Sequence, residues 1–144
     1  MTIYKIQIDE TGDKTISEVI QTGIVDFNMP YFGCSPPKPF ALYIKDKESA
    51  IIAGITGFYG KSSVQVDLMW VRENYRRQGI GRKLLHKLEF YALGKHCQII
   101  NLDTFDFQAK PFYEKHGYEC IGTIPKFYKT IGKNIDRHFM RKVL

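Results

Sequence analysis

Residues 64–94 read VQVDLMWVRENYRRQGIGRKLLHKLEFYALG, and no other stretch of the chain says as much about the fold. The first part, residues 64–71, is an apolar run with the length and composition of a β-strand. From residue 80 onward, apolar positions recur every three or four residues, which is typical of one face of an α-helix. Gly79 and Gly81 lie between the two segments. The predicted order is therefore strand, glycine loop and helix.

The glycine loop has the features of an anion-binding site. A glycine lets a ligand approach the backbone closely, and the first turn of a helix offers unpaired N–H groups and a dipole that favour negative charge. Arg76, Arg77 and Arg82 add full positive charges around the loop. The alternative is that the glycines only relieve crowding in a tight turn, and the three arginines favour the anion site over it.

The distribution of charge also indicates an anionic partner. The net charge is +6, and between residues 72 and 87 six basic side chains accompany a single acidic one, Glu73. Residues 126–144 likewise carry six basic side chains and only Asp136 as an acidic one. Because clustered charge raises the local concentration of ions of the opposite sign, we expect a phosphate-bearing partner, either a cofactor or a nucleic acid.

The remaining segments predict an α+β protein. Alternating or continuous apolar runs indicate strands, and apolar residues at helical spacing indicate helices. A turn-rich loop is expected at residues 28–39. The expected strands are residues 3–8, 40–45, 50–59, 64–71, 98–104, 118–123 and 138–143, and the expected helices are residues 14–27, 80–94 and 109–116.

Alternation along residues 64–71 assigns side chains to the two faces of that strand. Successive residues of a strand point to opposite faces. Asp67 is therefore expected on the same face as Met69 and Val71, and Leu68 and Trp70 on the other.

Size and composition limit the class of protein. With 144 residues, 44% of them hydrophobic, the chain is expected to form a single globular domain over residues 1–144. It has no apolar run of the roughly 20 residues that a membrane span needs and no signal-peptide pattern, so we expect a cytoplasmic protein with no membrane partner. Cys34, Cys97 and Cys120 are scattered, which predicts reduced thiols and no metal site.

Two spaced motifs give the chain a recognisable resemblance. Arg76, Gly79 and Gly81 follow a strand, and further on come Ala109, Tyr113 and the pair Gly117-Tyr118. In both motifs the chain resembles the GNAT superfamily of acetyl-CoA-dependent N-acetyltransferases. Asp106 departs from the family pattern, which commonly has an asparagine three residues before the alanine.

The resemblance implies a fold and a cofactor. The fold would be an α/β/α sandwich: a mixed, mostly antiparallel, twisted sheet of about seven strands, with helices on both faces and a splay between the strand ending at Val71 and the one starting near Gln98. The cofactor would be acetyl-CoA, with its pyrophosphate on the glycine loop and its pantetheine arm along the strand. The residues assigned to it are Met69, Trp70, Val71, Arg76, Arg77, Gln78, Gly79, Ile80, Gly81, Arg82, Gln108 and Phe112.

The resemblance also implies a reaction, the direct transfer of acetyl to a primary amine through a ternary complex. Tyr113 would protonate the departing thiolate, and a core position for its ring is the alternative. Asp67 would deprotonate or orient the amine, and an ion pair with a basic neighbour is the alternative. No cysteine falls in either motif, which disfavours a covalent acyl-enzyme.

The acceptor and the assembly are less specified. A small-molecule amine is preferred over a protein, in a pocket built from residues 26–43 and the loop at residues 123–136. Homodimers are frequent in the family that the chain resembles. Two other functions stay open: a non-catalytic acyl-CoA-binding regulatory domain, and a basic protein that binds nucleic acid.

Overall fold

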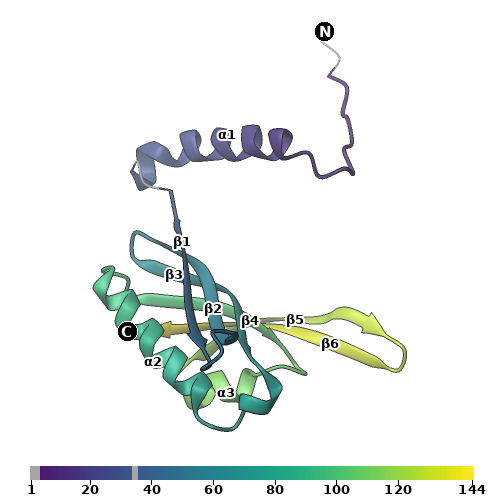
Figure 1. Ribbon diagram of the computed structural model, residues 1–144. Helices are drawn as coiled ribbons and strands as arrows, with labels where there is room; N and C mark the ends of the chain where they lie inside the picture. The colour runs from purple at the N-terminus through teal and green to yellow at the C-terminus, as the bar shows by residue number, and fades with distance from the viewer. Residues whose placement is uncertain (1–3, 34–35) are drawn as a thin grey trace. The chain divides into compact units, whose positions relative to one another are not determined.

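The computed structural model describes residues 4–33 and 36–144 of the chain, which divide into two compact units, residues 1–36 and residues 37–144. The prediction of a single domain over residues 1–144 stays a prediction. The larger unit holds both motifs of the sequence analysis (Figure 1).

The smaller unit is built around one helix, α1 (Lys14–Phe32), which begins where the side chain of Asp13 accepts a hydrogen bond from the N–H of Thr15 at 2.8 Å. The helix continues past residue 27 with Pro30 inside it, so the loop predicted at residues 28–39 was wrong for residues 28–32, and also for residues 38–39, which belong to a strand. It ends where the N–H of Gly33 donates to the carbonyl of Met29.

The strand predicted at residues 3–8 was also wrong where it can be checked. Residues 4–8 form no strand, and Ile3 lies outside the described residues. The alternation of Ile6 and Ile8 with polar residues predicted a strand, but a strand also needs a partner for its backbone groups, and the described structure gives this segment none.

The larger unit contains a twisted sheet whose strands lie in the order β1-β2-β3-β4-β6-β5. Only β3 and β4 are parallel, and every other neighbouring pair is antiparallel. This confirms the α+β class and the mixed, mostly antiparallel sheet, with six strands among the described residues against about seven predicted. The strands are β1 (Lys38–Lys45), β2 (Ile51–Gly60), β3 (Ser63–Val71), β4 (Ile99–Phe105), β5 (Glu119–Thr130) and β6 (Lys133–Val143).

Helix α2 (Ile80–Gly94) covers the strands through the apolar stripe that its sequence predicted. Leu84, Leu85, Leu88 and Ala92 are buried and pack with residues of β2, β3 and β4 in one core. The short helix α3 (Lys110–Lys115) contributes Tyr113 to the same core. The prediction of helices on both faces stays a prediction, because α1 belongs to the other unit.

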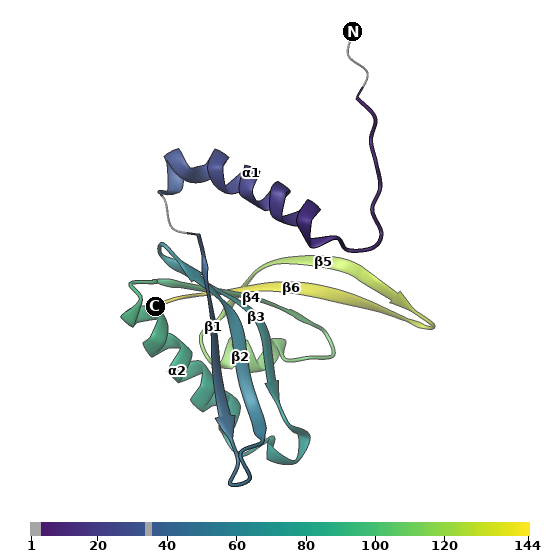
Figure 2. The ribbon, with the colours of Figure 1, turned by 45° about the horizontal axis from the view of Figure 1, so that its top comes forward.

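The parallel strands β3 and β4 pair over three residues only, from Ser63 with Ile99 to Gln65 with Asn101. Beyond that point they separate, and Figure 2 shows β4, β5 and β6 fanning away from β1, β2 and β3. The predicted splay between these strands is confirmed. It leaves one side of β3 and one side of β4 unpaired in the second half of each strand.

A β-bulge in β3 changes which residues share a face. Thr56 of β2 pairs with Leu68 while Gly57 pairs with Val66, so Asp67 is an extra residue without a partner in β2. A Cβ atom on Gly57 would lie 2.0 Å from the carbonyl oxygen of Gln65, so only glycine allows this close approach.

The face assignment of Asp67 was therefore wrong. Val66 lies on the core side before the bulge, and Met69 and Val71 pack against the same core after it, while Leu68 is exposed. An uninterrupted alternation would have put Val66 and Met69 on opposite faces. Asp67 stands at the point where the alternation restarts, so it does not share the face of Met69 and Val71.

The last two strands form a hairpin that projects past the other strands (Figure 1). β5 continues to Thr130 and β6 starts at Lys133, so residues 123–136, predicted as a loop of the acceptor pocket, are mostly strand. Residues of the two strands pair across the hairpin, for example Tyr128 of β5 with Ile135 of β6. The turn contains Gly132 in the left-handed region, with φ at 79°.

Candidate active site

The glycine loop forms an open backbone cradle at the start of α2. Arg77 and Gly79 both have left-handed φ angles, 60° and 77°. The first helical hydrogen bond runs from the N–H of Lys83 to the carbonyl of Gly79 at 3.1 Å. The N–H groups of residues 80–82 precede that bond and no side chain caps the helix, so these donors are available to an anion.

The side chains around the cradle have two different roles, shaping the loop and presenting positive charge. Arg76 donates through Nε to the carbonyl of Val71 at 2.9 Å, and Gln78 donates to the carbonyl of Asn74 at 3.1 Å, so both fasten the loop to the segment before it. Arg77 and Arg82 are exposed. Their charges are free to face a phosphate, whereas Arg76 and Gln78 shape the loop that holds it.

Three of the predicted cofactor residues meet where α2, α3 and β3 come together. A Cβ on Gly81 would lie 3.1 Å from the ring of Phe112 and 3.5 Å from the terminal methyl of Met69. The structure thus brings Gly81, Phe112 and Met69 into contact. Trp70 points away from this junction and is about half exposed.

Tyr113 is buried, and its hydroxyl donates to the sulfur of Met69 at 3.5 Å. Burial, with a smaller contribution from the negative charge of Asp103, raises the pKa of Tyr113 to about 12. The hydroxyl therefore keeps its proton at neutral pH and can act as a hydrogen-bond donor beside β3. Both the core position and the functional reading of Tyr113 are compatible with this geometry.

The second motif is held in place by hydrogen bonds within its own loop. The side-chain oxygen of Gln108 accepts from the N–H of Phe105 at 2.9 Å and from the hydroxyl of Thr104 at 3.3 Å. The same hydroxyl accepts from the N–H of Ala109 at 3.2 Å. Gln108, assigned to the cofactor from the sequence, therefore has its oxygen committed to the loop that starts α3.

Asp106, where the family commonly has asparagine, binds the β5–β6 hairpin. Its carboxylate accepts from Nε2 of His138 at 2.6 Å and from the N–H of Asp136 at 2.7 Å. These two hydrogen bonds, the one from Asp136 first, lower the pKa of Asp106. His138 is buried and shares a second hydrogen bond, 2.9 Å long, with the hydroxyl of Thr123.

A second carboxylate at the splay went unnoticed in the sequence. Asp103 lies on β4 two residues beyond Asn101, the last residue paired with β3, and it accepts from Nε of Arg137 at 2.8 Å. Asp103 and Arg137 are 34 residues apart. Only the pairing of β4 with β6 brings them together, so no local pattern could have found them.

No ion pair or hydrogen bond involves the side chain of Asp67 within residues 4–33 and 36–144, and the residue is exposed at the bulge. No three His, Cys, Asp or Glu side chains in that part of the chain gather closely enough to hold a metal ion. Cys97 is buried and Cys120 exposed, both as free thiols, and Cys34 lies outside the described residues.

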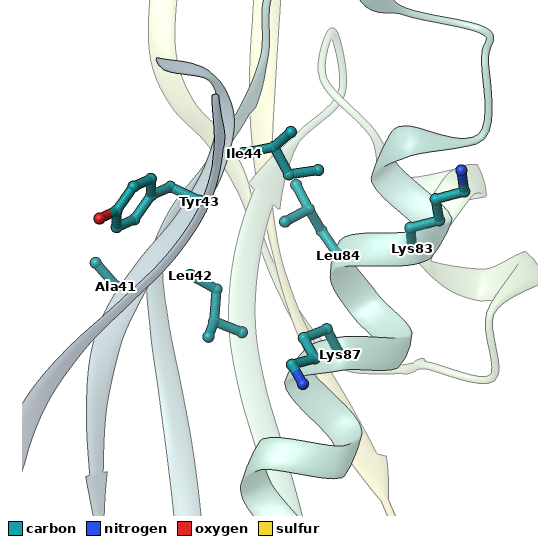
Figure 3. Close-up of a pocket in the computed structure, with 7 residues that line it drawn as sticks. All are labelled: Ala41, Leu42, Tyr43, Ile44, Lys83, Leu84 and Lys87. Carbon is teal, nitrogen blue, oxygen red and sulfur yellow. The ribbon is translucent and has the colours of Figure 1, made fainter. Parts of the chain in front are cut away.

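A groove of about 350 Å³ lies away from these residues, between β1 and α2. Leu42 and Ile44 of β1 point toward α2, with Ile44 facing Leu84 and Leu42 on the side of Lys87 (Figure 3). The groove contains neither Tyr113 nor Gly79, so it is not part of the candidate site. None of the helices within the described ranges is long and apolar enough to cross a membrane.

Comparison with known proteins agrees with this geometry. Residues 39–120 match the family model for the acetyltransferase (GNAT) domain, which covers more than half of the chain. A crystal structure of an acetyltransferase from Bacillus cereus superposes with a TM-score of 0.78 at 33% identity, over 96% of this chain and 98% of that one. The fold and site thus define an acetyl-transferring enzyme. The chain belongs to the GNAT acetyltransferase family.

Curated relatives have the same activity in their names. The chain is 27% identical to Acetyltransferase Atu2258 of Agrobacterium fabrum over 81% of this chain and 85% of that protein. It is 29% identical to blasticidin-S acetyltransferase of Streptomyces morookaense over 68% of this chain and 73% of that protein.

A cofactor is seen in one structure of the same fold. A Bacillus anthracis structure solved in complex with acetyl coenzyme A has a TM-score of 0.64 at 20% identity, over 76% of this chain and 65% of that one. GNAT acetyltransferases use acetyl-CoA, and the exposed cradle at the start of α2 suits its phosphates.

Proposed function

We propose that the enzyme transfers acetyl from acetyl-CoA directly to a primary amine of a small molecule, in a complex that holds both substrates at once. The observation that carries the proposal is the position of a buried, protonated Tyr113 beside Met69, between the backbone cradle of α2 and the opening of β3 from β4. Blasticidin S, named in one relative, is a small-molecule precedent for the acceptor.

The cradle supplies the grip on the cofactor. The unpaired N–H groups of residues 80–82 and the charges of Arg77 and Arg82 face the pyrophosphate. The pantetheine arm then runs along the unpaired side of β3 at residues 69–71, where it can pair with the backbone as an added strand would. A pantetheine arm on this path places the acetyl thioester of the cofactor near Tyr113.

The chemistry needs no covalent intermediate on the protein. The nitrogen of the neutral amine attacks the thioester carbon and the carbon–sulfur bond breaks. The thiolate that leaves takes a hydrogen bond from the Tyr113 hydroxyl, and the proton that the nitrogen loses passes through solvent to that thiolate. Of the two described cysteines, Cys97 is buried ahead of β4 and Cys120 lies on β5, and neither belongs to the two motifs. Of the two carboxylates on the strands of the splay, Asp103 is the one that can bind the amine, because Arg137 holds it in place. Asp67 stands at the bulge and does not share the face of Met69 and Val71.

A thermal-shift titration tests the cofactor half of this proposal. The wild type is heated with acetyl-CoA and with desulfo-CoA, which keeps the phosphates and lacks the sulfur. A ligand at 100 times its dissociation constant stabilises the fold by about 2.7 kcal/mol, so we expect a rise of several degrees with both.

The matched variants are Gly81→Glu and Gly94→Glu, which place the same side chain at opposite ends of α2. A Cβ on Gly81 already meets Phe112, whereas a Cβ on Gly94 has nothing within 4 Å. We expect Gly81→Glu to lose the ligand shift and Gly94→Glu to keep it. If the wild type itself does not shift, the cradle is not the cofactor site and the proposal fails.

A further inference from the structure

The carboxylate of Asp103 stands at the edge of an aromatic surface, in the opening between β3 and β4. Resting on the proposed function, we propose that Asp103 binds the ammonium group of the acceptor and that this aromatic surface binds the acceptor's carbon skeleton. The acceptor is then a primary amine with an apolar or aromatic group close to the nitrogen.

The register of the sheet puts Asp103 at the opening. On one side, β4 loses its partner after Asn101; on the other, it stays paired with β6, where Asp103 lies opposite Phe139. Leu102 and Thr104 are buried, so the intervening Asp103 projects from the other face of the strand, with its side chain 25% exposed. A substrate entering the opening from that face meets this carboxylate.

Asp103 and Tyr113 are within electrostatic reach of each other, since the charge of Asp103 contributes to the raised pKa of Tyr113. Tyr113 approaches β3 from the core, where its hydroxyl contacts Met69. An amine held by Asp103 and a thioester held beside Tyr113 would therefore approach the opening from opposite faces. Direct attack requires that the amine nitrogen and the thioester carbon meet at about 3–3.5 Å, which the opening between the strands allows.

Arg137 holds Asp103 in place. It donates through Nε to one carboxylate oxygen at 2.8 Å, and its guanidinium lies over the rings of Phe127 and Phe139, 5.0 and 5.2 Å from their centroids. No partner of the second carboxylate oxygen is found among the described residues. Arg137 is thus a positioning residue, fixed by two rings, that leaves one oxygen for an ammonium group.

The aromatic surface follows Asp103 along β4 and onto the hairpin. Phe105, two residues farther and on the same face, stacks on Phe107 with centroids 5.8 Å apart, and Phe127 and Tyr128 lie 5.9 and 5.5 Å from it. Phe107 and Tyr128 are more than half exposed. Exposed rings next to a carboxylate suit a cation attached to an apolar or flat group.

Asp67 on the opposite strand has neither feature. It is exposed at the bulge, it has no cation to fix its orientation within the described ranges, and it does not share the face of Met69. The pair of carboxylates therefore offers a matched comparison, in which the same substitution is made on the two sides of one opening.

Asp103 binds and orients the amine and is not the final proton acceptor. An alkylammonium has an ordinary pKa of about 10.4, so the small neutral fraction of the amine reacts, after one proton has passed to buffer or hydroxide in the solvent. The nitrogen–carbon bond then forms and the carbon–sulfur bond breaks, the second proton of the nitrogen passes through solvent to the leaving thiolate, and the sulfur takes its hydrogen bond from Tyr113. Loss of Asp103 should therefore act mainly on the KM of the amine.

The test measures CoA release with two probe amines, 2-phenylethylamine and ethylamine, at saturating acetyl-CoA. For the wild type we expect kcat/KM to be at least about tenfold higher with 2-phenylethylamine. Asp103→Asn should raise the KM for this amine at least about tenfold and leave the KM for acetyl-CoA unchanged. Asp67→Asn should change either value by less than about threefold. The melting shift with desulfo-CoA shows that each variant is folded.

Two further variants separate positioning from folding. Arg137→Gln should raise the KM for 2-phenylethylamine with little change in kcat, and Arg137→Lys, which keeps the ion pair, should restore part of the loss. Tyr128→Ala should reduce the preference for 2-phenylethylamine over ethylamine.

Each of three results overturns the inference: a loss confined to Asp67→Asn, equal use of the two amines, or acetyl-CoA binding by a wild type that acetylates neither. A wild type that does not bind acetyl-CoA at all overturns the proposed function instead.

Discussion

Tyr113 shows how burial adapts a single side chain to its task. A tyrosine hydroxyl in water has a pKa of about 10. For Tyr113, burial first, and the charge of Asp103 second, raise the pKa to about 12. The proton therefore stays on the hydroxyl throughout the usual assay range. The sequence predicted the residue and its role, while the position beside Met69 came from the packing of α3 on β3.

Replacing Tyr113 by phenylalanine tests that role. Tyr113→Phe removes one hydrogen bond to the leaving sulfur and leaves the ring in the core, so we expect kcat to fall about 10- to 100-fold. The melting shift with desulfo-CoA should be unchanged. In the wild type, kcat should show no falling limb from this group below about pH 11. A variant with full activity would show that Tyr113 serves packing alone.

The glycines of α2 differ in what they require of the backbone. Gly79 has a φ of 77°, where a Cβ is strained, and Gly94 has an ordinary helical backbone and open space around it. Gly79→Ala should lower the free energy of unfolding by about 1–2 kcal/mol, and Gly94→Ala should raise it by up to about 1 kcal/mol. Urea denaturation measures both values. Equal effects in the two variants would mean that the left-handed turn is not maintained in solution.

At the scale of elements, the loop between β4 and α3 depends on a contact that no local pattern contains. Asp106 accepts hydrogen bonds from His138 and from the backbone of Asp136, and so fastens the loop to β6. An asparagine has one side-chain oxygen and would turn its NH₂ group toward one of these two donors. The aspartate thus connects the loop to the hairpin through both of its carboxylate oxygens.

The pH dependence of stability should report this connection. The pKa of Asp106 is lowered in the folded chain, so its contribution to stability is present above the ordinary value of 3.8 and is lost as the pH falls through the lowered value. We expect Asp106→Asn to lower the urea midpoint at pH 7. The gap to the wild type should close below about pH 4. A gap of constant size from pH 7 to pH 3 would contradict the ionised contact.

The bulge in β3 is the element that the alternation rule could not predict. A period of two describes a strand that pairs regularly, whereas the bulge follows from the pairing of β2 with β3 and from the close approach at Gly57. The rule correctly placed Val64 and Val66 on one face and failed from Asp67 onward. Asp67, the candidate base, therefore does not lie on the face of Met69 and Val71 that the sequence predicted for it.

At the scale of the whole molecule, charge gathers where the cofactor's phosphates are expected. The net charge is +6, and Arg77 and Arg82 are exposed beside the cradle. Such charges attract an anion at low ionic strength and are screened beyond about 10 Å at 0.1 M salt. Cofactor affinity should thus depend on salt as well as on the backbone donors.

Titration calorimetry at two salt concentrations checks this expectation. Between 50 and 500 mM NaCl, the Kd for acetyl-CoA should rise about 3- to 10-fold. Arg82→Gln should reduce the dependence, and Lys133→Gln, at the far end of the hairpin, should leave it unchanged. If the affinity did not depend on salt, the backbone N–H groups alone would account for the binding of the cofactor's phosphates.

What the sequence determined by itself is local. The span of α2, the strand before it and the glycine loop between them follow from a helical period, an apolar run and two residues that need no side chain. The α+β class followed from the order of such elements, and the resemblance to the family followed from two spaced motifs. These features depend on neighbours within a few residues, so they can be read along the chain.

The tertiary structure decided how distant residues meet. Asp103 with Arg137, Asp106 with His138 and Asp67 at its bulge are all set by strand register, which arises from contacts 9 to 34 residues apart in the sequence. The length of the β5–β6 hairpin belongs here too, because its two strands stabilise each other. A one-residue change of register moves a side chain to the other face of a sheet, and only the folded chain fixes that choice.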